Sequence, residues 1–170
     1  KPVKLEERNG VAIDRVFGSV AVGPFNYQVC TSGEFKTKIH LKNFSLAQLG
    51  LIGLVLRDLN DGWFGIGFAK SRGLGTVEVK YEQAIVQYPG CQLREDRRIW
   101  AIGQQKSWPH TALLGASEFL TENPYGFPEN DRDESTPVAA KEMALGFGVQ
   151  LTWTGQVEVQ DLFRRAVEAW

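Results

Sequence analysis

The chain has 170 residues, the size of one domain or of one domain with an appendage. Hydrophobic residues make up 43% and charged residues 23%, as in ordinary globular proteins, and no apolar run approaches the roughly 18 to 20 residues of a membrane span. The formal net charge is −1, so any binding of a polyanion must come from a local basic patch.

Cysteine and histidine usage argues against a disulfide framework and against a metal site. Cys30 and Cys91 are the only cysteines and form no C-x-x-C pair, which fits a reducing, cytoplasmic setting. His40 and His110 share no ligand spacing with each other or with the cysteines. We therefore predict no resident metal or cofactor.

The first 34 residues predict short extended segments. Residues 1–9 are charged and without pattern, as in a tail or connector. Residues 11–15 and 20–22 flank the turn Phe17-Gly18-Ser19 and predict a hairpin, which Gly23-Pro24 is expected to end. Residues 25–29 alternate and predict a third extended piece.

Residues 35–42 carry the clearest strand pattern of the chain. Phe35, Thr37, Ile39 and Leu41 alternate with Lys36, Lys38, His40 and Lys42, which predicts one core face and one basic face. The basic face is either the water-facing side of an antiparallel sheet or an anion-binding surface.

A helix follows, and its start is encoded locally. Ser45 is a good N-cap, and Gln48 stands where it completes a capping box. The predicted buried stripe is Leu49, Ile52, Leu56 and Leu59, widened by Val55, and Asn60-Asp61-Gly62 ends the helix. Gly50 and Gly53 inside it predict close packing of the helix on a sheet.

Residues 63–81 lead from an apolar segment through a glycine-rich turn into an expected strand at 76–81. The turn carries Lys70, Ser71 and Arg72 and leaves through Gly73 and Gly75. Glycine reaches positive φ without penalty and lets another backbone approach closely, so such a turn can lay N–H groups and cations along a phosphate chain. A hairpin connection with solvated charges is the other interpretation.

Beyond residue 81 the pattern is weaker. Strands are predicted at 84–87, 99–102 and 146–153, and helices at 111–120, 138–145 and 157–170. The terminal helix is expected to bury Leu162, Phe163, Ala166, Val167 and Trp170. Residues 121–137 are rich in proline and acids and predict an exposed loop.

Known catalytic and nucleotide-binding motifs fit poorly. Ala69 and Phe64 occupy the two glycine positions that a P-loop needs before Lys70-Ser71. No Ser-His-Asp or Cys-His arrangement has a credible spacing. Asp14 is a weak candidate for a catalytic acid or metal ligand, and a structural turn contact is the favoured interpretation.

Taken together, residues 11–81 resemble the RAMP superfamily of CRISPR-associated proteins, most closely the backbone subunits of type III effector complexes. The resemblance rests on V-A-I-D-R-x-F-G at 11–18, the alternating segment 33–41, the capped leucine-rich helix, and I-G-x-x-K-S-R-G-L-G at 66–75. It implies an α+β, ferredoxin-like (RRM-like) fold that binds a guide-RNA backbone and stacks along it with related subunits.

The chain departs from that family at its start. The family's catalytic aspartate, which cuts target RNA with a metal ion such as Mg²⁺, belongs to a first half that residues 1–10 do not match. The chain is therefore expected to be the C-terminal half of such a subunit. Residues 1–96 would form the RNA-binding domain, and residues 97–170 a mixed α/β extension.

The resulting hypotheses differ in class. The favoured one is a non-catalytic RNA-binding scaffold in the cytoplasm, whose partners are guide RNA, target single-stranded RNA and other RAMP-type subunits. The alternatives are an endoribonuclease subunit with its catalytic aspartate mostly outside this chain, and an unrelated protein that binds a phosphorylated ligand. The candidate RNA-binding residues are Lys70, Ser71, Arg72, Gly73, Gly75, Lys36, Lys38, Lys42 and Arg15.

Overall fold

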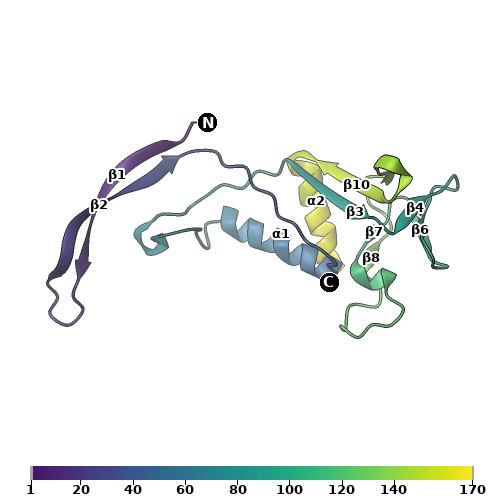
Figure 1. Cartoon of the computed structure of the whole chain (residues 1–170), viewed down its shortest axis with the longest axis horizontal. Helices are drawn as coiled ribbons and strands as arrows, with labels where there is room; N and C mark the ends of the chain where they lie inside the picture. The colour runs from purple at the N-terminus through teal and green to yellow at the C-terminus, as the bar shows by residue number, and fades with distance from the viewer. Residues whose placement is uncertain (1, 170) are drawn as a thin grey trace. The chain divides into compact units, whose positions relative to one another are not determined.

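The computed structural model describes residues 2–169 (Figure 1). The chain divides into two compact units, Lys1–His40 and Leu41–Trp170. The first unit contains only strands, whereas the second contains two helices and several short antiparallel sheets. The prediction of an α+β protein is confirmed.

The first unit is one long antiparallel hairpin. Strand β1 (Lys4–Ile13) pairs with β2 (Val20–Ser32), and the turn between them contains Gly18 at a φ of 66°. The hairpin prediction is confirmed. The tail predicted at residues 1–9 is wrong from Lys4 onwards, because these charged residues pair with the end of β2. Gly23-Pro24 does not end β2. The pairing of β1 with β2 continues past it, with register shifts near Gly10 and Ala12.

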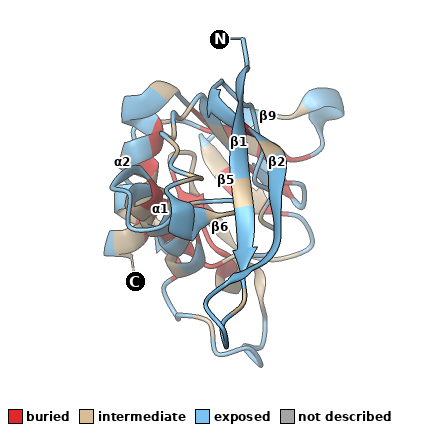
Figure 2. Ribbon diagram, turned by 90° about the vertical axis from the view of Figure 1, so that its left-hand side faces the viewer, coloured by how far each residue is buried: buried red, intermediate tan, exposed pale blue. Residues whose placement is uncertain are grey.

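Most residues of this hairpin are exposed (Figure 2). Val29 is its buried apolar residue, whereas Leu5, Val11, Ile13, Val20, Val22 and Phe25 are exposed. A two-stranded ribbon has no second layer of its own to cover such side chains.

The strand predicted at residues 35–42 is wrong. These residues form no strand, and Phe35 and Ile39 are 72% and 54% exposed. Alternation favours an extended backbone, but a strand also needs hydrogen bonds from a partner strand, and the described residues pair none with this segment.

Helix α1 (Leu46–Asn60) begins as its sequence predicts. The Ser45 hydroxyl accepts a hydrogen bond from the Gln48 N–H at 3.3 Å, and the Gln48 side chain accepts one from the Ser45 N–H at 3.0 Å. Asp61 is the C-cap, and Gly62 follows with a φ of 77°. Of the predicted buried stripe, Leu49 and Leu59 are buried, Ile52 and Leu56 are partly buried, and Val55 is exposed.

The two helices of the second unit pack tightly at glycines. Helix α2 (Gly155–Glu168) buries Val159, Leu162 and Ala166. A Cβ on Gly50 would lie 2.9 Å from the Val167 nitrogen, and a Cβ on Gly53 would lie 2.6 Å from the Phe163 Cβ. The close packing predicted for these glycines is thus present, but against a helix and not against a sheet. Trp170 lies outside the described residues.

Three small sheets complete the second unit (Figure 1). The first has the order β3 (Gln83–Tyr88), β10 (Val149–Thr154) and β9 (Lys141–Glu142); the second β4 (Cys91–Leu93), β5 (Arg98–Ala101) and β6 (Ser107–Pro109); the third β7 (Leu113–Leu114) and β8 (Arg132–Asp133). All pairs are antiparallel. The division expected after residue 96 falls between the paired strands β4 and β5 and stays a prediction.

The predicted strands at 84–87, 99–102 and 146–153 correspond to β3, β5 and β10. The helices predicted at 111–120 and 138–145 are wrong. The first segment contains β7 and the 3₁₀ turn η2 (Ala116–Phe119), and the second contains β9 and η3 (Ala144–Gly146). Each segment is divided between a short strand and a 3₁₀ turn, so neither contains a continuous helix.

The strand predicted at residues 76–81 is also absent, because side chains take the place of a partner strand. The Asn60 carboxamide accepts from the Val79 N–H at 2.6 Å and donates to the Val79 carbonyl at 3.3 Å. The Gln156 side chain accepts from the Tyr81 N–H at 2.9 Å. The segment is thereby held to both helices before β3 begins.

The acidic stretch at 121–137 is exposed only in part. Residues 121–126 and 128–130 are exposed as predicted, but Asp131 is 1% and Thr136 4% exposed. The Asp131 carboxylate accepts from the Leu46 N–H at 2.7 Å, at the start of α1, and from the Ser117 N–H at 3.3 Å. Burial raises the pKa of Asp131, and these two hydrogen bonds oppose that rise.

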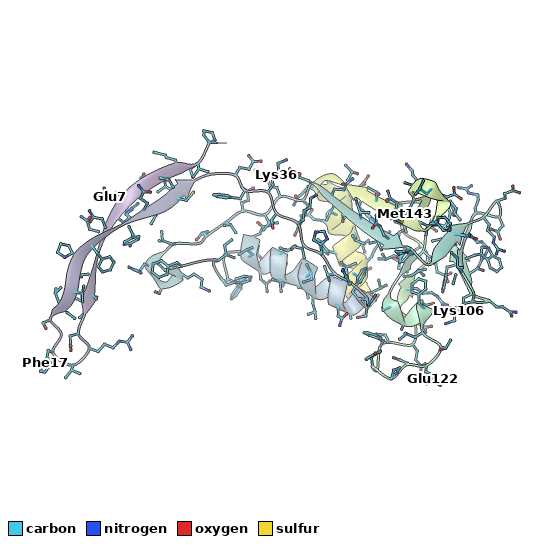
Figure 3. All side chains as sticks on the ribbon, viewed as in Figure 1. Glu7, Phe17, Lys36, Lys106, Glu122 and Met143 are labelled. Carbon is cyan, nitrogen blue, oxygen red and sulfur yellow. The ribbon has the colours of Figure 1, made fainter. Side chains whose placement is uncertain are left out.

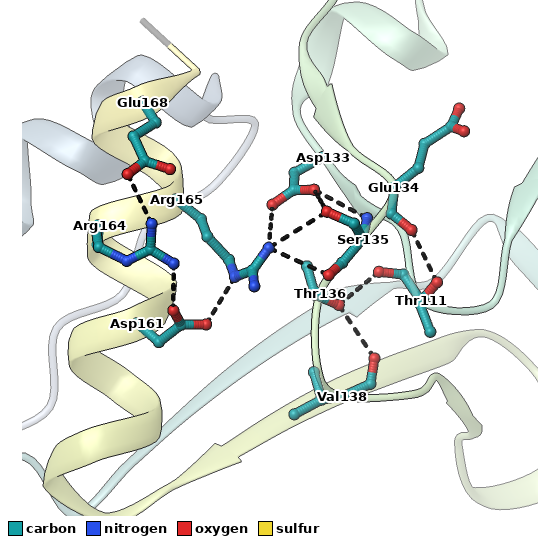
Figure 4. A network of polar contacts seen from close by, with 10 residues as sticks. All are labelled: Thr111, Asp133, Glu134, Ser135, Thr136, Val138, Asp161, Arg164, Arg165 and Glu168. Atoms are coloured by element: carbon teal, nitrogen blue, oxygen red, sulfur yellow. Dashed lines mark hydrogen bonds and ion pairs between the residues drawn. The ribbon is translucent and has the colours of Figure 1, made fainter.

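Arg165 connects α2 to the end of the same stretch (Figure 4). Its guanidinium lies 3.0 Å from Asp133 and 2.6 Å from Asp161, and it donates to the Ser135 carbonyl at 3.1 Å. Burial tends to raise the pKa of Asp133, but hydrogen bonds from Ser135 and Arg165 outweigh it and hold that pKa below its ordinary value. The pKa of Asp161 is lowered by Arg164 and Arg165.

We predict that alanine at Gly50 or Gly53 destabilises the chain despite its better helix propensity. The propensity gain is about 1 kcal/mol, whereas overpacking a close contact costs about 1 to 3 kcal/mol. The combined variant should therefore lower the free energy of unfolding in a urea titration. Gly90→Ala is the control, because a Cβ there meets nothing within 4 Å. Stabilisation by the double variant would contradict the packing argument.

We also predict that Arg165→Met lowers the free energy of unfolding by about 2 to 3 kcal/mol at neutral pH. Arg164→Met, at a guanidinium that is 55% exposed, should cost about 0 to 1 kcal/mol. The pKa values of Asp133 and Asp161 are lowered from the ordinary value of 3.8, so their ionised forms stabilise the folded chain at pH values above 3.8. This stabilisation is lost as the pH falls through their folded-state pKa values. The Arg165→Met deficit should therefore shrink below about pH 4. A deficit independent of pH would contradict the ion-pair origin.

Candidate nucleic-acid interface

The glycine-rich turn forms a closed loop directly after α1. The Ile66 N–H donates to the Gly75 carbonyl at 2.9 Å, so the two ends of residues 66–75 meet. Gly75 has a φ of 91°, and a Cβ there would overlap the Ile66 carbonyl oxygen. The closure therefore requires glycine at position 75.

The tip of this loop presents two cations. Lys70–Arg72 form the 3₁₀ turn η1, in which the Arg72 N–H donates to the Ala69 carbonyl at 2.9 Å. Gly73, at a φ of 78°, ends the turn, and its N–H donates to the Lys70 carbonyl at 3.1 Å. Lys70, Ser71 and Arg72 are all exposed. The turn therefore carries two exposed positive side chains within three residues.

Aromatic side chains accompany these cations. The Arg72 guanidinium carbon lies 5.1 Å from the centroid of the Phe68 ring. Phe68 is 76% exposed and Trp63 80% exposed. In the sequence these rings stand within an apolar segment, and they were not among the predicted binding residues. The available signal was their interruption by Gly65 and Gly67, which is unlike a core strand.

The structure brings together five of the nine predicted binding residues: Lys70, Ser71, Arg72, Gly73 and Gly75. Lys42 is exposed but precedes α1, whereas the loop follows it, and a helix of 15 residues spans about 22 Å. Arg15, Lys36 and Lys38 are exposed and belong to the Lys1–His40 unit. Figure 3 labels Lys36, and labels Phe17 at the hairpin turn near Arg15.

Asp14 serves the hairpin turn. One of its carboxylate oxygens accepts from the N–H groups of Val16 at 2.7 Å and Phe17 at 2.9 Å. These bonds, with that from Phe17 the stronger influence, lower the pKa of Asp14. The geometry matches the turn contact favoured from the sequence, and its role in catalysis stays untested.

Residues 2–169 lack two other kinds of feature. They contain no group of three or more His, Cys, Asp or Glu side chains arranged to hold a metal ion. In the same described part of the chain, no helix has the length and apolar character needed to cross a membrane.

Residues 1–78 match the family model of the RAMP superfamily. The matched segment contains the hairpin, α1 and the whole closed loop, and covers less than half of the chain. The similarity is therefore to the RAMP superfamily and is carried by residues 1–78. Neither the curated proteins nor the solved structures contain a match to this chain.

We predict that Gly75→Ala opens the loop. The new Cβ cannot coexist with the Ile66 carbonyl in the observed geometry, so the Ile66 N–H should lose its bond to residue 75. Amide hydrogen exchange of Ile66 should accelerate relative to wild type. Gly67→Ala is the matched control, because Gly67 also has positive φ, at 81°, but open space around it. Equal acceleration in both variants would show that only backbone strain matters.

Proposed function

We propose that this chain is a guide-RNA-binding scaffold subunit of a type III CRISPR effector complex in the cytoplasm. The observation that carries the proposal is the closed loop with Lys70 and Arg72 at its tip, because it lies inside the segment that matches the RAMP superfamily. Two neighbouring cations on a rigid turn suit the repeating phosphates of an RNA backbone.

The charge distribution supports a backbone contact. The whole chain carries a net charge of −1, yet residues 62–77 include Lys70 and Arg72 and no acidic residue. Attraction to a polyanion would therefore be local to this loop. Contacts to phosphates position RNA without reading its sequence, so the proposed subunit would accept unrelated guides equally.

Association with other RAMP-type subunits is part of the same proposal. The β1–β2 ribbon has two unpaired edges and many exposed apolar side chains, features that favour pairing with another chain. Within residues 2–169, no strand pairs with residues 35–42 or 76–82. We propose that these segments belong to the C-terminal half of a ferredoxin-like RAMP fold, which is completed by strands from outside this chain.

A scaffold role fits the chain better than catalysis. Asp14 already accepts two turn hydrogen bonds, and a target-cutting aspartate, with any Mg²⁺ it uses, would lie elsewhere in the assembly. A site for a small phosphorylated ligand would be concave, whereas Lys70, Ser71 and Arg72 at the loop tip are exposed.

We predict that replacing Lys70 and Arg72 together with alanine weakens RNA binding and its salt dependence. For single strands, log affinity falls with log salt at a slope of about −0.7 per neutralised phosphate, so the slope should flatten by roughly one to one and a half. The measurement is a salt titration of the affinity of the full chain for two unrelated single-stranded RNAs. Both should lose affinity about equally.

The control is the double variant Lys141→Ala with Arg94→Ala, which changes the net charge from −1 to −3, as the test variant does, at exposed positions outside the loop. If both double variants flatten the slope to the same extent, binding follows net charge and the loop is only a solvated connection.

A further inference from the structure

We propose that Phe68 and Trp63 form a stacking platform for unpaired bases, so that the ligand of the loop is single-stranded RNA with accessible base faces. This inference rests on the proposed function and adds a second kind of contact to it. Within six residues the chain exposes Trp63 (80%), Phe64 (42%), Ile66 (52%) and Phe68 (76%). Single exposed apolar residues are ordinary on protein surfaces, whereas grouped exposed apolar residues are typical of binding surfaces.

Other aromatic side chains of the second unit are buried in its core. Trp108 and Trp153 are 4% and 0% exposed, and Phe119 packs against both Trp108 and Tyr88. Trp63 follows the glycine beyond the end of α1, and Phe68 precedes the cationic turn. Both rings are therefore placed by backbone features of the loop and not by packing in the core.

Arg72 makes Phe68 suitable for stacking. Its guanidinium carbon lies 5.1 Å from the ring centroid, a cation–π geometry that restrains the ring at the loop tip. The ring remains 76% exposed and keeps surface for a base. The Ile66–Gly75 bond fixes the loop on which both side chains stand, which reduces the entropy lost on binding.

The neighbouring charges favour RNA over a protein partner. Two cations and no acids accompany the exposed rings within residues 62–77. Proteins that bind single strands combine a basic track for phosphates with aromatic rings for bases, and stacking of this kind tolerates any sequence. A duplex hides its base faces, so the loop should discriminate against paired RNA of the same length.

The test uses the full chain and three probes: a single-stranded RNA of about 15 nucleotides with mixed sequence, the same backbone carrying abasic residues, and the corresponding duplex. The variants are Phe68→Leu and Trp63→Leu, which keep an apolar side chain but remove the flat ring. Phe147→Leu is the control, because Phe147 is a similarly exposed ring, at 71%, outside the loop.

For each stacked base, the loop variants should weaken binding to the mixed-sequence strand by about 5- to 150-fold. Binding to the abasic strand should be unchanged, and the salt slope should stay at the wild-type value because the phosphate contacts persist. Phe147→Leu should bind all three probes like wild type.

Two results would overturn the stacking inference alone: unchanged affinity of both loop variants for the mixed-sequence strand, or equal losses on normal and abasic strands. The second would mean that the rings only position Arg72. If replacing Lys70 and Arg72 with alanine left the salt slope unchanged, the proposed function would instead be overturned. Absence of RNA binding by the wild-type chain would overturn both.

Discussion

The buried carboxylate of Asp131 is the constraint on which the second unit depends. It accepts hydrogen bonds from Leu46 at the start of α1 and from Ser117 in η2. Two backbone bonds surround this junction: Gly115 donates to the Asp131 carbonyl at 2.6 Å, and Ala116 donates to the Phe44 carbonyl at 2.8 Å. A side chain on Gly115 would overlap the Asp131 carboxylate. Three segments distant in sequence thus meet at one carboxyl group, and the otherwise unsatisfied N–H at the helix start is paired.

This junction holds the start of α1 against residues 115–117 and 131, and the candidate site follows the end of that helix. The helix is held along its length by the close approach of Gly50 and Gly53 to α2, and at its end the Asn60 side chain binds Val79. Residues 63–75 lie between Asn60 and Val79, which are hydrogen-bonded to each other. The loop can therefore be exposed at its tip and still begin and end at defined positions, as a preorganised binding loop requires.

Local signals in the sequence predict local features well. The capping box of Ser45 and Gln48, the glycine end of α1, the hairpin turn around Gly18 and the terminal helix all depend on neighbouring residues, and all are present. The errors concern partners that are distant in sequence. Alternation at 35–42 and 76–81 cannot reveal whether a second strand is available, and Asn60 and Gln156 gave no sign of bonding to the later segment. Asp131 is the clearest case, because its acidic, proline-rich neighbourhood predicts exposure, whereas its role depends on Leu46, 85 positions away.

The distribution of acids explains how a chain of net charge −1 presents a basic loop. Glu118 is buried, where it accepts from Trp108 at 2.8 Å and pairs with Arg132 at 3.1 Å. Asp133 and Asp161 pair with Arg165, and Asp131 caps α1. Such buried or paired carboxylates project little field beyond their partners, especially over distances longer than the roughly 8 Å screening length at physiological salt. In this molecule several carboxylates hold the second unit together, whereas residues 62–77 contain Lys70 and Arg72 and no acidic residue.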